Sequence, residues 1–178
     1  MIATSPPHGR RVQKLLQTLF DITLLRRGPE DIPHSWLVLN FCVGLWLSAL
    51  LATTVLLENF NKIDAGIAIG SAAVGVFCYF VVLAIAGFGA RLIQTVSALI
   101  GAGALISFAM LVILVLMTPF LGRNIATLGA FLLLVWSVPV KGHIIARAIN
   151  WHWYAGIVIA LSIFLLQLAF TQTMTPRS

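Results

Sequence analysis

The strongest constraint on this chain is a succession of five long apolar runs, at residues 34–57, 65–88, 93–117, 121–140 and 153–171. A helix needs about 20 apolar residues to cross the roughly 30 Å hydrocarbon core of a bilayer. Charged residues make up 9% of the chain, against about 25% in an ordinary soluble domain. We therefore predict an all-α polytopic membrane protein whose five transmembrane helices form one domain over residues 34–171.

The fourth run has the shortest uncharged part of the five. Its uncharged part, residues 125–140, would make a helix about 24 Å long at 1.5 Å per residue. Either Arg123 extends to the bilayer surface, or the bilayer thins, or the helix continues past Pro139. The sequence leaves these three alternatives open.

An amphipathic helix is predicted over residues 10–27, ahead of the first span. Its apolar positions fall on one face at 100° per residue, and they are Val12, Leu15, Leu16, Leu19, Phe20 and Ile22. Arg10, Arg11 and Lys14 supply the cationic side of a helix that would lie in the lipid headgroup layer. Packing on a cytoplasmic partner or on the protein's own loops would use the same face. Gly28 and Pro29 are expected to end this helix, and residues 1–9 and 172–178 are expected to be tails.

The basic residues predict how the chain is oriented in the membrane. With the N-terminus in the cytoplasm, eight cations lie inside: Arg10, Arg11, Lys14, Arg26, Arg27, Arg91, Lys141 and Arg147. Three lie outside: Lys62, Arg123 and Arg177. This bias follows the positive-inside rule, and an odd number of spans places the C-terminus on the opposite side. Arg26 and Arg27 would hold the start of the first span in the cytoplasm.

The chain shows no pattern typical of a catalytic or metal site. No ionisable residue is expected inside a span, because each stands at or beyond a predicted helix end. Cys42 and Cys78 are isolated within apolar runs, the histidines have no ligand spacing, and neither GxSxG nor a P-loop occurs. We predict no enzyme activity, no cofactor and no metal. The net charge of +6 lies beside the spans and indicates contact with anionic lipid headgroups, not with nucleic acid.

Two groups of residues inside the spans predict how the helices associate. Small residues recur at four-residue spacing, as in Gly66/Gly70 and Ser97/Gly101, which favours close packing within the bundle or between copies of the chain. Asn40 and Gln167 are intramembrane polar residues. Each is expected to make one interhelical hydrogen bond.

A contact surface is predicted on the cytoplasmic face. Its members are charged or titratable residues near span ends: Arg26, Arg27, Glu30, Asp31, Arg91, Lys141, His143 and Arg147. They could simply set topology and form local salt bridges. Alternatively, they could dock a membrane-protein partner or acidic lipid headgroups.

The stretch "RRGPEDIP" before five closely spaced spans resembles the layout of Yip1-domain membrane proteins. Eukaryotic members of that family carry a D-L-Y-G-P motif before the first span, and Gly28 and Pro29 match its G-P pair. No functional residue is carried over. The chain also resembles small basic membrane proteins of Gram-negative bacteria, which implies the inner membrane.

Two functions are compatible with these features. The first is a non-enzymatic membrane protein that organises or regulates a membrane complex through its cytoplasmic face. The second is a small transporter or lipid-handling protein for a neutral or lipidic substrate. A continuous cavity that reaches Asn40 or Gln167 would favour the second function.

Overall fold

The computed structural model describes residues 8–57 and 62–175. Within these residues every regular element is helical, and five helices are long and apolar enough to cross a membrane. The all-α polytopic prediction is confirmed at that level. The predicted tails at 1–9 and 172–178 lie largely outside the described residues, although α1 begins at His8 and α7 ends at Met174.

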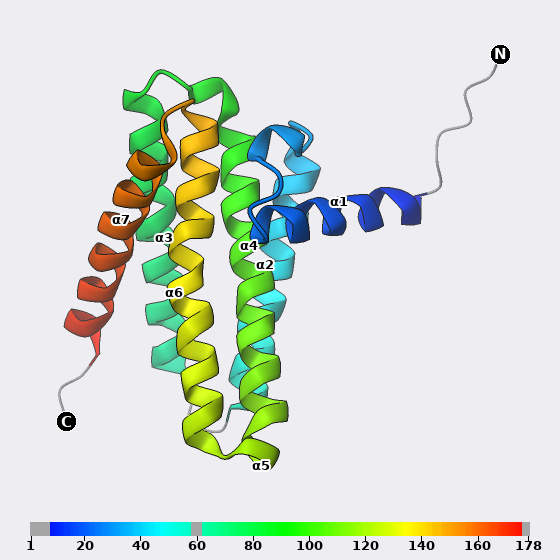
Figure 1. Ribbon diagram of the computed structural model, residues 1–178, viewed down its shortest axis with the longest axis vertical. Coiled ribbons are helices and arrows are strands. Elements are labelled where there is room, and N and C mark those ends of the chain that lie inside the picture. Colours follow the sequence, from blue (N-terminus) through cyan, green and yellow to red (C-terminus); the bar gives the residue numbers. More distant parts are fainter. Residues whose placement is uncertain (1–7, 58–61, 176–178) are drawn as a thin grey trace.

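The helices that cross the molecule form a bundle of α2, α3, α4, α6 and α7 (Figure 1). Their bounds are Trp36–Leu56, Lys62–Ile85, Leu92–Val112, Arg123–Ala148 and Trp153–Met174. Successive helices run in opposite directions, so α2 and α4 are parallel. These two pack on each other, α6 packs on α4 and α7, and α3 lies outside against α7. A π-helical stretch, Ile113–Met117, and the short α5, Thr118–Leu121, extend α4.

Helix α6 continues past Pro139, which is one of the three alternatives left open for the fourth run. It extends beyond the expected end at Val140 and ends at Ala148, a length of about 39 Å. A proline inside a helix removes one backbone hydrogen bond, and neighbouring helices make this tolerable in membrane proteins. The apolar pattern resumes with Ile144 and Ile145, both fully buried, and their packing carries the helix onward.

Helix α1, His8–Thr23, runs crosswise to the bundle and lies nearer to one end of it than to the other (Figure 1). We call this the α1 end; α2, α4 and α7 begin there and α3 and α6 end there. The opposite end is the far end. Leu19 and Ile22 of α1 are fully buried, and Leu19 rests on Gly101 of α4, where an added Cβ would come within 2.7 Å of its Cδ2. The first span begins at the α1 end, and the last one finishes at the far end.

The end of α1 differs from the prediction. Gly28 was expected as the helix cap, but the helix stops at Thr23 and Leu25 takes a left-handed conformation with φ of 61°. The amide of Arg26 donates to the carbonyl of Asp21, and that of Leu25 to the carbonyl of Ile22, which is a Schellman motif. Glycine or asparagine usually occupies this position. Leu25 is used instead because its side chain packs against the buried core.

Candidate functional site

The predicted contact surface is largely engaged within the molecule. Arg147 of α6 forms an ion pair with Glu30 at 2.9 Å, and Arg27 forms one with Asp21 at 3.2 Å. All four side chains remain partly exposed. Each pair links the segment between α1 and α2 either to the bundle or to α1 itself.

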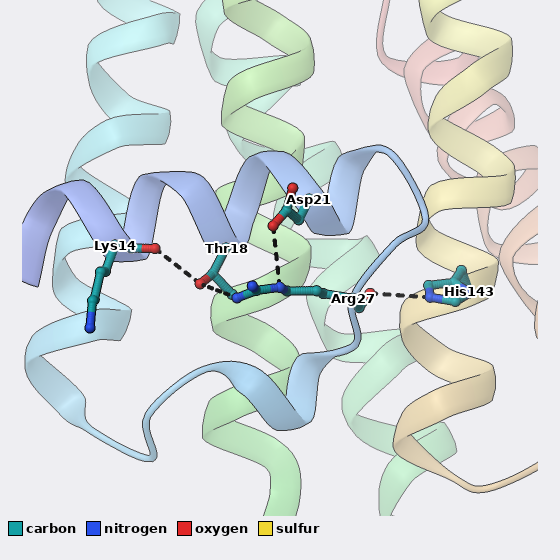
Figure 2. A network of polar contacts seen from close by, with 5 residues as sticks. All are labelled: Lys14, Thr18, Asp21, Arg27 and His143. Carbon is teal, nitrogen blue, oxygen red and sulfur yellow. Dashed lines mark hydrogen bonds and ion pairs between the residues drawn. The ribbon is translucent and has the colours of Figure 1, made fainter.

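A network of polar contacts continues from Arg27 (Figure 2). Its Nη1 donates to Thr18 Oγ1 at 3.5 Å, and Thr18 in turn donates to the carbonyl of Lys14 at 3.0 Å. On the other side, Nε2 of His143 donates to the carbonyl of Arg27 at 3.1 Å. Helix α1, the connecting segment and α6 are thereby joined in one chain of contacts.

Three further side chains fasten the same end by donating to backbone carbonyls. Gln94 donates to Ile32 at 2.9 Å, Trp136 to Thr23 at 3.2 Å, and Arg91 to Ala148 at 3.4 Å. The last contact is favourable because the carbonyls at a helix C-terminus carry partial negative charge. Arg91 also lies 5.6 Å from the ring centre of Phe88. Such contacts satisfy carbonyls that would otherwise be left unpaired at the helix ends.

Arg26, Asp31 and Lys14 are the exposed remainder of the predicted cationic and contact residues. None of them forms an ion pair within the described part of the chain. The side chains of Arg10 and Arg11 lie outside that part. The polar contacts at the α1 end therefore mainly attach the N-terminal segment to the bundle. Arg26, Asp31 and Lys14 are the charged side chains left exposed there.

Lys141 is separated from the rest of this surface. It lies in α6, seven residues before the helix ends at Ala148, and its side chain lines a cavity with Ser137 and Leu134. The uncharged part of the fourth run ends at Val140, but the helix that is long and apolar enough to span a membrane continues to Ala148 and so includes Lys141. An ionisable residue within such a helix is costly unless it is paired or faces a cavity.

The cavity has a volume of about 700 Å³ and is lined by residues from α2, α3, α4, α6 and α7. Side chains with hydroxyl or amide groups contribute from every one of these helices: Thr53, Ser71, Ser107, Ser137, Gln167, Thr171 and Thr175. Bulky apolar residues fill the intervening positions: Trp46, Leu50, Ile67, Met110 and Phe164. Ligand sites in proteins have this size range and this mixture of apolar walls with a few polar groups.

The two intramembrane polar residues have different environments. Gln167 lines the cavity and donates to the carbonyl of Ser71 at 2.7 Å, joining α7 to α3. Gly75 makes room for it, since a Cβ there would come within 3.0 Å of the Gln167 Cδ. Asn40 is exposed on α2 and is not part of the cavity. Only Gln167 therefore contributes to the candidate site.

The described side chains contain no group of three or more His, Cys, Asp or Glu that could hold a metal ion. A cluster of several hydroxyls, one amide and one ammonium can bind a ligand by hydrogen bonds and charge. Sequence reasoning missed this site because its members lie on separate spans. The available signal was the four-residue spacing of Ser137 and Lys141, which puts both on one face of a continuous helix.

Comparison with known proteins gave no match to this chain among family models, curated proteins or solved structures. Its assignment therefore depends on the geometry of the α1 end and of the cavity.

Proposed function

We propose that this protein is a small transporter or lipid-handling protein that binds a lipidic ligand in the cavity between its spans. The observation that carries the proposal is one cavity of about 700 Å³ lined by all the bundle helices and reaching Gln167. Helices that serve only as anchors would be expected to pack more closely, because close packing is the more stable arrangement.

The shape of the cavity supports entry from the bilayer. Leu57 and Thr175, the residues that cap α2 and α7, line it, so it extends to the far end of the bundle. Helices α2 and α3 both line it but are not among the helix pairs that pack closely within the described residues. The wall between them is accordingly the weakest part of the enclosure, and it faces lipid.

The proposal includes a placement in the membrane. The cations near the α1 end support an N-terminus in the cytoplasm and a C-terminus on the opposite side, in the inner membrane of a bacterium. The Yip1-like layout stays a prediction from the sequence.

Reporter fusions after Leu57 test the orientation of the chain in the membrane. Neutralising both Arg26 and Arg27 should lower the fraction of molecules inserted in the proposed orientation. An unchanged orientation in the double variant would show that the arginine pair is redundant.

Helix α1 is proposed to lie in the headgroup layer. Val12 and Phe20 are 43% and 58% exposed, and with Leu16 they form a stripe at four-residue spacing. Lys14 lies on the opposite side of the helix and extends toward the segment that follows α1 (Figure 2). An exposed apolar stripe opposite a cation is typical of helices lying in an interface.

A direct test uses two neighbouring alanines of α3. Ala72 lines the cavity, whereas Ala73 is exposed on the outer surface of the same helix. We expect the native protein, released from mild detergent for native mass spectrometry, to retain a bound lipid. Ala72→Trp should fill the cavity and abolish retention, while Ala73→Trp should leave it unchanged. Equal lipid retention by both variants would exclude the cavity as the binding site.

Organisation of a membrane complex through the α1 end is the second candidate. The exposed Arg26, Asp31 and Lys14 favour it, because they form no ion pairs within the described residues and are free to contact a partner. Crosslinking from residues 12–35 in native membranes, followed by identification of the products, tests this function. Recovery of only lipid and the protein itself would count against it.

A further inference from the structure

Lys141 is a charged residue within α6, and its side chain lines the cavity. It stands about 10 Å before the end of the helix, and its row on the helix face continues to Ser137 and Leu134, which line the cavity with it. The next residue, Gly142, packs against the backbone of Gly156 and Ile157 of α7. The lysine is thus held between a close helix contact on one side and the cavity on the other.

The direction of the helix determines where this side chain can reach. The Cα–Cβ bonds of an α-helix tilt toward its N-terminus, and α6 begins at the far end of the bundle (Figure 1). Lys141 therefore leans away from the nearer membrane surface and into the cavity. A lysine that extended to the surface at the α1 end would have to turn back against this tilt.

No group in the described part of the chain neutralises Lys141. Asp21 and Glu30 are engaged with Arg27 and Arg147, and Asp31 is exposed in the connecting segment. Among the described residues, the ammonium of Lys141 has neither an ion pair nor a hydrogen bond. Charged groups inside membrane proteins normally pair with an opposite charge, so a bound anion is expected to pair with Lys141.

We infer that the cavity binds an anionic phospholipid, whose phosphate pairs with Lys141 and whose acyl chain extends toward the far end. The inference rests on the proposed function and names its ligand class. A phospholipid is favoured because the cavity adjoins the bilayer between α2 and α3 and is walled by apolar side chains beyond the lysine. From Phe164 to Thr175 the α7 wall is about 16 Å long, close to half of the roughly 30 Å hydrocarbon core.

The lipid would come from the leaflet at the α1 end. A phosphate at Lys141 is near that end of the bundle, and the hydroxyls of Ser137 and Ser107 lie deeper in the cavity. In the proposed orientation this is the cytoplasmic leaflet. Arg27 and Arg147 are engaged in ion pairs with Asp21 and Glu30, and Lys141 is the cation that lines the cavity.

The test compares two phospholipids with identical chains, phosphatidylglycerol and phosphatidylcholine, titrated into the purified full-length protein and measured by native mass spectrometry. Both lipids carry a phosphate, but the choline ammonium of phosphatidylcholine repels Lys141, and this repulsion predicts about a tenfold preference for phosphatidylglycerol in the native protein. Lys141→Gln should remove the preference and retain phosphatidylcholine binding, and Lys141→Arg should keep the preference. Size-exclusion profiles identify any variant that fails to fold, in which case Lys141→Met replaces it.

The outcomes separate this inference from the proposed function. A retained preference in Lys141→Gln, or equal binding of both lipids by the native protein, would overturn the role of Lys141 while leaving the cavity as a lipid site. Displacement of bound phosphatidylglycerol by inorganic phosphate alone would also overturn it, because the site would then recognise a free anion. Binding of neither lipid to the native protein would contradict the proposed function itself.

Discussion

The two halves of the bundle are built on different principles. At the α1 end, fully buried residues from four helices meet, among them Leu19, Cys42, Ala98 and Ile144, and ion pairs tie the segment after α1 to α6 and to α1. In the half toward the far end, the helices diverge around a cavity lined with hydroxyl groups. The half at the α1 end stabilises the fold through its buried core. The half toward the far end can therefore keep a cavity without unfolding the protein.

Small residues account for part of this difference. An added Cβ on Gly156 would overlap the carbonyl oxygen of Gly142, so α6 and α7 approach with their backbones in contact at the α1 end. Such approach is a usual source of helix association in membranes. In the half toward the far end, the bulky Trp46 of α2 and Phe164 of α7 line the cavity instead.

The largest effect is expected from breaking the backbone contact at the α1 end. Gly156→Ala should destabilise the protein by about 3 kcal/mol, because overpacking forces helices apart. Gly44→Ala is the matched control, since nothing lies within 4 Å of its added methyl group. Thermal unfolding in detergent measures both variants. Equal melting temperatures would show that the two helices can separate without loss.

A smaller effect is expected from loosening α1. Leu19→Ala removes a fully buried side chain and should cost about 2–3 kcal/mol, mostly as detachment of α1 from α4. Phe20→Ala changes an exposed neighbour and should not detach the helix. Amide hydrogen exchange over residues 12–23 measures the difference. Similar protection in both variants would mean that Leu19 does not anchor α1.

The polar contact in the half toward the far end should contribute less. Gln167→Leu removes the hydrogen bond to Ser71, and interhelical hydrogen bonds in membranes average about 0.6 kcal/mol. We expect a small decrease in unfolding free energy, measured by denaturant titration in mixed micelles. A loss of several kcal/mol would show that the cavity wall is as important to the fold as the α1 end.

The smallest effect should come from the ion pair between Arg147 and Glu30. Their side chains are 52% and 42% exposed, and pairs this exposed contribute about 0.2–1 kcal/mol. A double-mutant cycle with Glu30→Gln and Arg147→Gln should give a coupling energy at the lower end, declining as salt is added. Coupling that is insensitive to salt would indicate a buried pair.

Much of the architecture followed from the apolar runs alone. Residues 34–57, 65–88 and 153–171 were predicted as spans, and α2, α3 and α7 agree with them within a few residues. Long runs are reliable because a bilayer-spanning backbone must satisfy its own hydrogen bonds. Helix ends were less predictable. Helix α1 stops at Thr23, where Leu25 takes a left-handed backbone conformation while its side chain packs against the buried core. The helix propensities of the residues around Leu25 do not indicate this end.

Most of the candidate site could not be predicted from the sequence. Gln167 is recognisable as a polar residue in a span, but the cavity that it lines is formed by residues from five helices. Lys141 was assigned to the cytoplasmic surface because the uncharged part of the fourth run ends at Val140. The helix continues to Ala148, so the lysine lies within it, seven residues before its end.

Pro139 lies at the junction of the two halves, between Ser137 and Lys141. Its missing backbone hydrogen bond makes this the point where α6 bends most easily. A hinge here would move the part of α6 that contributes Leu134 and Ser137 to the cavity, while Ile144 and Ile145 stay fixed in the core. The α6 wall of the cavity would then shift with little disturbance of the anchored end, with a single residue as its pivot.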